Sequence, residues 1–294
     1  MDGSKTTPTP GESTSTPGAQ PPAPVLVACA QLPLAVGDLV GNRAAADRAI
    51  EAAAAAGVGV LVLPELANSG YVFRDAAHAA ELAEPLDGPT VTAWAAAAAR
   101  HGMVIVGGFC ERDEDGAVRN SAVLVDPTGV RALYRKAHLF GTEKAVFVPG
   151  DTRPPVVETA VGRIGVMVCY DLEFPEWVRD VALRDAELLC APVNWPLFPR
   201  PEGERAAEVV RVQADAAVNR MFVAACDRTG TENGVEWTGG SVITDPDGFP
   251  LAGPATETGE SLLVAACALD QARDKRIGEH NHVFADRRPE LYSR

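Results

Sequence analysis

Apolar runs and helical stretches alternate along most of this chain. Residues 58–65 and 163–169 each place at least four apolar side chains in succession, a pattern that predicts buried strands. Residues 42–56 and 89–102 are alanine-rich and are bounded by helix-start and helix-stop residues, which predicts helices. Because a strand that is apolar on both faces needs cover on both sides, the pattern favours a layered α/β fold.

The expected elements fall into two halves with one plan. In the first half we expect strands at 25–32, 58–65, 103–109, 121–125 and 130–135, and helices at 42–56 and 89–102. In the second half we expect strands at 163–169, 187–193, 221–226 and from 241 onward, and helices at 174–185 and 204–220. Each half closes with an Asp-Pro-x-Gly turn between two strands, at residues 126–129 and 245–248. We predict two β-α-β-α-β-β-β halves whose sheets pack face to face with helices outside, which is a four-layer α-β-β-α sandwich.

Residue types at the helix ends support these boundaries. Asn42 is the expected N-cap of the first helix, which ends at Gly57. Pro89 and Gly102 bound the second helix in the same way. Residues 174–176, Phe-Pro-Glu, are a third helix start, with proline in the first turn and glutamate at the positive end of the helix dipole.

Composition limits the classes of function. Residues 1–24 are rich in Pro, Thr, Ser and Gly, which predicts a disordered tail without a secretory signal, and residues 25–294 are expected to form one domain. The net charge of −14 disfavours nucleic acid as a partner. No apolar run approaches the length of about 18 residues that a membrane span requires, so a soluble protein is expected.

The cysteines and histidines predict neither disulfides nor a metal site. The six cysteines contain no Cys-x-x-Cys pair, which is typical of reduced thiols in a cytoplasmic protein. The five histidines lack zinc-ligand spacing. His280 and His282 could hold a metal on an extended segment, but a polar C-terminal tail is the favoured interpretation. We predict no metal and no cofactor.

Three reactive side chains come at the ends of predicted strands. Cys169 precedes a helix start, where partial positive charge favours the thiolate. Glu65 ends the strand at 58–65, and Lys136 follows the strand at 130–135. Singly they could be a core cysteine, a surface carboxylate and a solvated lysine. Together they supply the nucleophile, base and oxyanion-stabilising cation for hydrolysis of a C–N bond through a thioester.

The same segments resemble the nitrilase superfamily of carbon-nitrogen hydrolases. Pro64-Glu65, Tyr134-Arg135-Lys136 and Cys169-Tyr170-Asp171, followed by Phe174-Pro175-Glu176, occur in that family's order and spacing over roughly residues 25–273. The resemblance implies the four-layer fold, a Glu-Lys-Cys triad, and a homodimer or higher homo-oligomer. It also implies that Glu143 orients Lys136 and the substrate, and that the backbone N–H of Tyr170 is the second oxyanion donor.

The residues after the cysteine bear on the substrate. Family members that hydrolyse nitriles usually carry Trp-Glu where this chain has Tyr170-Asp171, so the resemblance favours a small-molecule amide. ω-Amidase-like proteins often carry arginine at the position of Glu173, whose negative charge favours a neutral or cationic amide over a dicarboxylic monoamide. A short aliphatic or ω-amino amide, of the 5-aminopentanamidase type, is therefore expected. The alternative is that Glu173 pairs with a nearby arginine such as Arg179.

Other substrates and other roles stay open. N-carbamoyl amines are the nearest alternative substrates, followed by nitriles and ω-amides. A non-enzymatic scaffold would be expected to have lost a triad residue, and all three are present.

Four more residues are candidate substrate contacts because they follow the triad strands or a neighbouring strand. Tyr71 follows Glu65, Phe140 follows Lys136, and Asn194 and Trp195 follow the strand at 187–193. Trp195 is expected on a rim loop, with packing or dimer contact as the alternatives.

Overall fold

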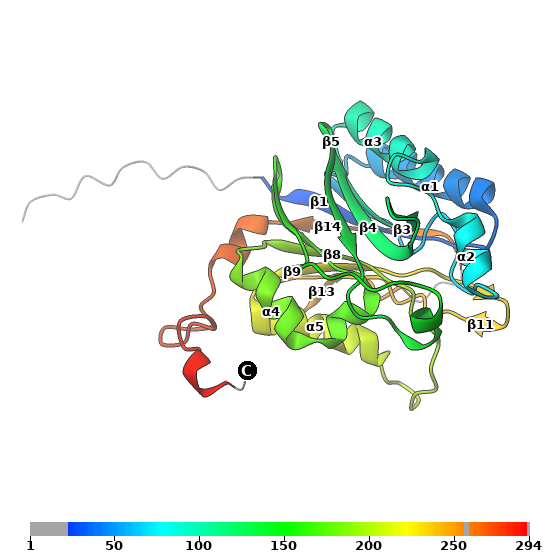
Figure 1. The fold of residues 1–294 in the computed structure, drawn as a ribbon. Coiled ribbons are helices and arrows are strands. Elements are labelled where there is room, and N and C mark those ends of the chain that lie inside the picture. Colours follow the sequence, from blue (N-terminus) through cyan, green and yellow to red (C-terminus); the bar gives the residue numbers. More distant parts are fainter. Residues whose placement is uncertain (1–22, 256–258, 293–294) are drawn as a thin grey trace, which may run out of the picture.

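Two six-stranded sheets form the centre of the molecule, with helices over their outer faces (Figure 1). The structure is a computed structural model that describes residues 23–255 and 259–292. The predicted tail, residues 1–24, lies outside the described residues except for its last two. Within the described ranges, no helix is long and apolar enough to cross a membrane.

The elements have the following bounds. The first sheet contains β1 (Val25–Gln31), β2 (Val60–Val62), β3 (Val104–Arg112), β4 (Val118–Asp126), β5 (Gly129–Arg135) and β14 (Ser261–Cys267). The second contains β6 (Val156–Thr159), β7 (Gly162–Val166), β8 (Leu188–Pro192), β9 (Phe222–Cys226), β12 (Val242–Thr244) and β13 (Pro250–Ala252), and a separate hairpin contains β10 (Thr231–Glu232) and β11 (Val235–Glu236). The α-helices are α1 (Leu39–Ala55), α2 (Ala76–Leu82), α3 (Pro89–His101), α4 (Pro175–Leu183) and α5 (Ala207–Asn219). The 3-10 helices are η1 (Gly141–Ala145), η2 (Cys169–Glu173), η3 (Leu269–Arg273) and η4 (Pro289–Leu291).

The strand order confirms the predicted repeat. The ladders β1-β2-β3-β4-β5 and β7-β8-β9-β12-β13 follow the chain in the same sense, with three parallel strands and then two antiparallel ones. The sequence did not predict β14 and β6, which add an antiparallel strand beside β1 and β7. The segment before β14 includes the undescribed residues 256–258, and β14 returns the chain to the first sheet.

Alternating side chains on the central strands explain the four layers. On β2, Val60 and Val62 pack into the layer between the sheets, whereas Leu61 packs beneath the helices of the first half. Ile50 of α1 and Trp94 of α3 belong to that second layer. A strand buried on both faces must be apolar at every position, which is the pattern read from the sequence.

One predicted helix boundary is wrong. Helix α1 begins at Leu39, because the carboxylate of Asp38 accepts the backbone N–H of Gly41 at 2.9 Å and caps the helix there. Asn42 lies inside the helix, and its side chain binds the backbone of Ala35. The ends of α3 at Pro89 and Gly102 are confirmed.

Candidate active site

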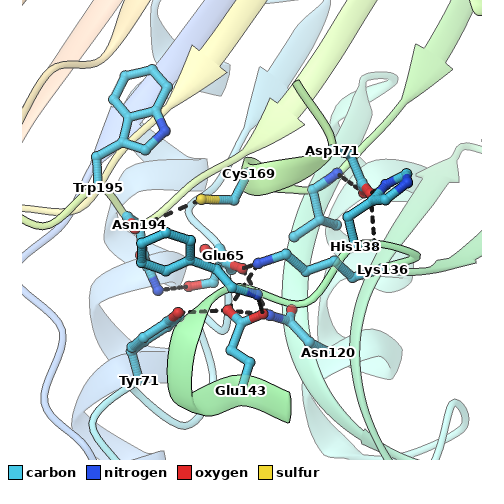
Figure 2. A network of polar contacts seen from close by, with 12 residues as sticks. Glu65, Tyr71, Asn120, Lys136, His138, Glu143, Cys169, Asp171, Asn194 and Trp195 are labelled. Carbon is cyan, nitrogen blue, oxygen red and sulfur yellow. Dashed lines mark hydrogen bonds and ion pairs between the residues drawn. The ribbon is translucent and has the colours of Figure 1, made fainter. Parts of the chain in front are cut away.

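Three strand ends deliver the predicted triad to one point in the molecule (Figure 2). Glu65 lies three residues beyond β2, Lys136 directly follows β5, and Cys169 lies three residues beyond β7. Glu65 and Lys136 come from the first half of the chain and Cys169 from the second. The site therefore exists only when the two sheets pack together.

Lys136 is buried between two carboxylates. Its Nζ donates to Glu65 Oε1 at 2.7 Å and to Glu143 Oε1 at 2.8 Å. An ammonium has three N–H donors, so one donor is left for another acceptor such as a developing oxyanion. Glu143 is itself held by the Tyr71 hydroxyl, which donates to Oε1 at 2.5 Å, and by the Phe140 backbone N–H, which donates to Oε2 at 2.9 Å.

Burial and charge set the protonation of this pair. Burial raises the pKa of Glu65 to about 7, although Lys136 and the side chain of Asn120 act in the opposite direction. Burial lowers the pKa of Lys136, but attraction to Glu143 and Glu65 outweighs it and holds the pKa well above its usual value. The lysine is therefore an ammonium, and Glu65 can change its protonation near neutral pH.

Cys169 begins the 3-10 helix η2 and has a left-handed backbone, with φ of +46°. Such a conformation costs about 1–3 kcal/mol for a residue other than glycine, and it is found preferentially at functional sites. The Cys169 sulfur lies 3.7 Å from the carbonyl oxygen of Asn194. The described turn thus places the thiol beside the loop that follows β8.

The expectation of a thiolate next to a helix start is wrong. Helix α4 begins only at Pro175, so the turn η2 separates Cys169 from its first residue. Burial and the negative charge of Glu65 raise the pKa of the Cys169 thiol well above its usual value, despite the opposing charge of Lys136. The resting sulfur is therefore a neutral thiol, and it needs a base to become a nucleophile.

A glycine of β3 lets the Glu65 backbone approach. A Cβ atom added to Gly108 would lie 2.5 Å from the Cα atom of Glu65 and 2.8 Å from the backbone nitrogen of Leu66. Both neighbours are backbone atoms, so a larger residue would displace the segment that carries the carboxylate.

The sequence did not predict two polar contacts of the site. Asn120 of β4 donates from Nδ2 to Glu65 Oε1 at 2.7 Å. His138 donates its backbone N–H to Asp171 Oδ1 at 3.1 Å, and its ring Nδ1 lies 2.7 Å from the same oxygen. His138 lies close to Lys136 in the chain, and Asp171 lies close to Cys169. This closeness to two triad residues was a feature of the sequence that could have indicated the contact between His138 and Asp171. No signal marked Asn120, since a polar residue on a strand usually faces solvent.

The candidate substrate-contact residues differ in how they contact the cluster of charged side chains around Lys136. The Phe140 and Tyr170 rings are 5.2 Å apart at their centroids. The side-chain nitrogen of Asn194 donates to the backbone oxygen of Glu65 at 3.0 Å. Trp195 follows in the same loop, is buried with 5% exposure, and donates its backbone N–H to Asp227 Oδ1 at 3.0 Å. Figure 2 shows Trp195 and Tyr71 on either side of the cysteine and glutamate.

Glu173 lies apart from these contacts. Its carboxylate forms an ion pair of 2.7 Å with Arg211 of α5. The alternative that Glu173 pairs with an arginine is confirmed, but the partner is Arg211 and not Arg179, whose guanidinium donates to the backbone oxygen of Val218 at 2.8 Å. Helix α5 packs against η2 and α4, which brings Arg211 closer than sequence distance suggests.

Among the residues that the structure describes, no group of three or more His, Cys, Asp and Glu side chains could hold a metal ion. Lys136 and Asn120 bind the two carboxylates, whereas Glu65 Oε2 has no hydrogen-bond partner among the described residues. The groups that the cluster offers for chemistry are a thiol, an ammonium and two carboxylates.

Comparison with known proteins shows the family of this chain. The family model described as carbon-nitrogen hydrolase matches residues 26–277, and the chain belongs to that family. The chain is 38% identical to a protein named nitrilase from Pyrococcus abyssi, over 86% of this chain and 93% of that protein. It is 35% identical to N-carbamoylputrescine amidase from Solanum lycopersicum, over 91% and 94% of the two chains.

Solved structures agree with the sequence relatives. An amidase from Nesterenkonia sp. superposes with a TM-score of 0.74 at 29% identity, over 90% of this chain and 97% of that one. A structure of a mutant of the Nesterenkonia sp. AN1 amidase, with a TM-score of 0.71 at 28% identity over 86% and 96% of the two chains, shows acrylamide added at the active site cysteine of that protein. The present chain is thus an enzyme that hydrolyses C–N bonds, of the amidase branch of the nitrilase superfamily.

Proposed function

We propose that this enzyme hydrolyses a small aliphatic or ω-amino carboxamide to a carboxylic acid and ammonia through a thioester on Cys169. The observation that carries the proposal is the convergence of a neutral thiol, a carboxyl group with a pKa of about 7 and a buried ammonium in one cluster. These are the three groups that acyl transfer from nitrogen to sulfur requires.

The first half-reaction follows from the protonation states. Glu65 takes the proton of the Cys169 thiol as the sulfur attacks the amide carbon, and a C–S bond forms. The oxyanion is stabilised by the remaining N–H of Lys136 and by the backbone N–H of Tyr170. Glu65 then gives the proton to the nitrogen, the C–N bond breaks, and ammonia leaves.

The second half-reaction uses the same groups in reverse. Glu65 takes a proton from water as the water oxygen attacks the thioester carbon. The C–S bond breaks, the sulfur recovers the proton, and the carboxylic acid leaves. Glu143 binds no reacting atom in this scheme, and it helps to keep the ammonium of Lys136 in place through its own hydrogen bond to Nζ.

Aromatic side chains around the cluster support the substrate class. Figure 2 shows Tyr71 and Trp195 near the cluster, and Phe140 donates its backbone N–H to Glu143 and has its ring 5.2 Å from that of Tyr170. Such aromatic rings offer apolar surface to a short aliphatic chain and ring faces to a distal ammonium group. The charge of Glu173 would repel a carboxylate, but its ion pair with Arg211 reduces that repulsion. The preference against dicarboxylic monoamides should therefore be modest.

An N-carbamoyl amine is the second candidate substrate. The relative from Solanum lycopersicum, at 35% identity, is named N-carbamoylputrescine amidase. Attack of the same thiol on a carbamoyl carbon would release ammonia, and hydrolysis would then give the amine and carbon dioxide. Such a substrate carries a distal ammonium group, as an ω-amino amide does, so the same aromatic side chains would suit both.

Ammonia release from four compounds tests these assignments. We would compare kcat/KM for butyramide, 5-aminopentanamide, glutaramate and N-carbamoylputrescine, with Cys169→Ala as the blank. The proposal requires that butyramide or 5-aminopentanamide be the best substrate. A best rate with N-carbamoylputrescine would replace it by the second candidate, and a best rate with glutaramate by an ω-amidase. Ammonia release equal to that of the blank for all four would contradict an amidase.

Reversal of the charge at Glu173 gives a finer test of which substrate charge the enzyme prefers. We expect Glu173→Arg to narrow the ratio between 5-aminopentanamide and glutaramate by a fewfold, because it reverses a charge near the cysteine turn. Glu176→Arg makes the same charge change on the exposed first turn of α4 and is the matched control. An equal shift in both variants would assign the effect to overall charge.

The assembly and the location of the enzyme stay predictions. A homodimer or higher homo-oligomer would be measured by sedimentation, and a cytoplasmic location by fractionation.

A further inference from the structure

Asn120 contacts all three charged residues at the centre of the site. Its side-chain Nδ2 donates to Glu65 Oε1 at 2.7 Å and lies within 3.4 Å of Glu143 Oε1. Its backbone oxygen accepts the backbone N–H of Lys136 at 2.8 Å. The residue is 1% exposed, so water does not substitute for these contacts.

The chemistry of an amide suits this position. Two carboxylates flank one ammonium, which leaves the centre of the site with more acceptors than donors. The Nδ2 group adds two N–H donors without adding charge, whereas a lysine or arginine there would compete with Lys136 for both carboxylates. Reversing the amide would bring its oxygen against a carboxylate oxygen, so the orientation is fixed by its partners.

The hydrogen bond from Asn120 also makes the two carboxylate oxygens of Glu65 different in their contacts. Oε1 receives both Lys136 Nζ and Asn120 Nδ2. Oε2 is buried and has no hydrogen-bond partner among the described residues. One oxygen is thus anchored, and the other remains available to exchange a proton.

We propose that Asn120 is a positioning residue of the active site, which holds Glu65 and Glu143 on either side of Lys136 and leaves Glu65 Oε2 for the reacting groups. This inference rests on the proposed function of the triad. Asn120 touches no substrate atom, and it acts through the orientation and acidity of Glu65.

The role has a consequence for pH dependence. The hydrogen bond from Asn120 opposes the burial that raises the pKa of Glu65, so its loss raises that pKa further. The base must be ionised to accept the thiol proton, so kcat/KM falls as pH drops through this pKa, and a higher pKa moves the acidic limb to higher pH. The charged and titratable groups that face Glu65 are the same in wild type and in Asn120→Ala: Lys136, Glu143, Cys169, Tyr71 and Arg228.

The experiment compares Asn120→Ala and Asn120→Asp with wild type on butyramide from pH 5 to pH 9. We expect kcat to fall about tenfold to a hundredfold, because a hydrogen bond to a charged group is lost. KM should stay within about twofold, and the acidic limb should rise by about one pH unit. Asn120→Asp keeps the shape of the side chain and adds a third carboxylate, so its loss should be at least as large.

Asn219→Ala is the matched control. Asn219 is also a buried asparagine, and its Nδ2 donates to the backbone oxygen of Asp215 at 2.9 Å near the end of α5. Its replacement should leave both kcat and the acidic limb unchanged, even if the melting temperature drops.

Four results would overturn the inference. If either folded Asn120 variant has the wild-type kcat and an unchanged acidic limb of kcat/KM, Asn120 has no positioning role. An equal loss at every pH with an unmoved limb, or a failure of both variants to fold while Asn219→Ala folds, would make Asn120 a packing residue. Cys169→Ala is measured in parallel: if it keeps wild-type activity, the triad itself is wrong and the positioning role falls with it.

Discussion

Replacement of Lys136 by methionine tests the electrostatics of the buried centre. Methionine fills a similar volume but leaves Glu65 and Glu143 without the ammonium that binds both. At an effective dielectric near 20, two unit charges about 4 Å apart interact by about 4 kcal/mol, and two carboxylates repel by that order. Loss of one partner from a buried ion pair costs about 3–5 kcal/mol by itself. For a chain of this size that corresponds to a fall of about 6–15 °C in melting temperature.

The cost should depend on pH. Without the ammonium, burial and repulsion from Glu143 raise the pKa of Glu65 in the folded state further above the unfolded value, so the folded variant binds more protons than the unfolded chain. Stability then falls as pH rises between the unfolded and folded pKa values. The deficit relative to wild type should be smallest near pH 5 and largest near pH 8.5.

Differential scanning calorimetry of wild type and Lys136→Met at pH 5, 7 and 8.5 measures this deficit. Lys144→Met removes an exposed lysine from the neighbouring η1 and is the control, with no pH-dependent deficit expected. A Lys136→Met deficit of the same size at pH 5 and pH 8.5 would refute the electrostatic explanation. Ammonia release should be lost at every pH, since an oxyanion donor is typically worth about a hundredfold to a thousandfold in rate.

Three further outcomes are expected. Cys169→Ala should abolish ammonia release and thioester trapping with little change in melting temperature, and activity in this variant would contradict the mechanism. Iodoacetamide should label Cys169, which is 8% exposed, before a core thiol such as Cys190, which is 0% exposed. Gly108→Ala should lower kcat tenfold or more, because the added Cβ displaces the Glu65 backbone, whereas Gly107→Ala, on the opposite face of β3, should cost stability and spare kcat. The acidic limb of kcat/KM in wild type should lie near pH 7, where Glu65 loses its proton, and a limb near pH 4 would show that the buried carboxyl is not the base.

The sequence by itself determined the layers and the three reactive residues. Apolar runs such as Val60–Val62 report burial on both faces, which requires a covering layer on each side of the sheet. Glu65 and Cys169 were identified because each stands at or close to the end of such a run, and Lys136 because it directly follows a predicted strand. These features depend on neighbours along the chain, and neighbours along the chain are visible in a sequence.

The tertiary structure decided which groups touch and how acidic they are. Asn120 reaches Glu65 across 55 positions of sequence, and Arg211 reaches Glu173 from another helix. No local pattern encodes such pairs, because they depend on the register between strands and the packing of helices on sheets. The thiol of Cys169 was expected to be acidic from its sequence neighbours, yet burial beside Glu65 has the opposite effect, since desolvation acts on the folded site as a whole.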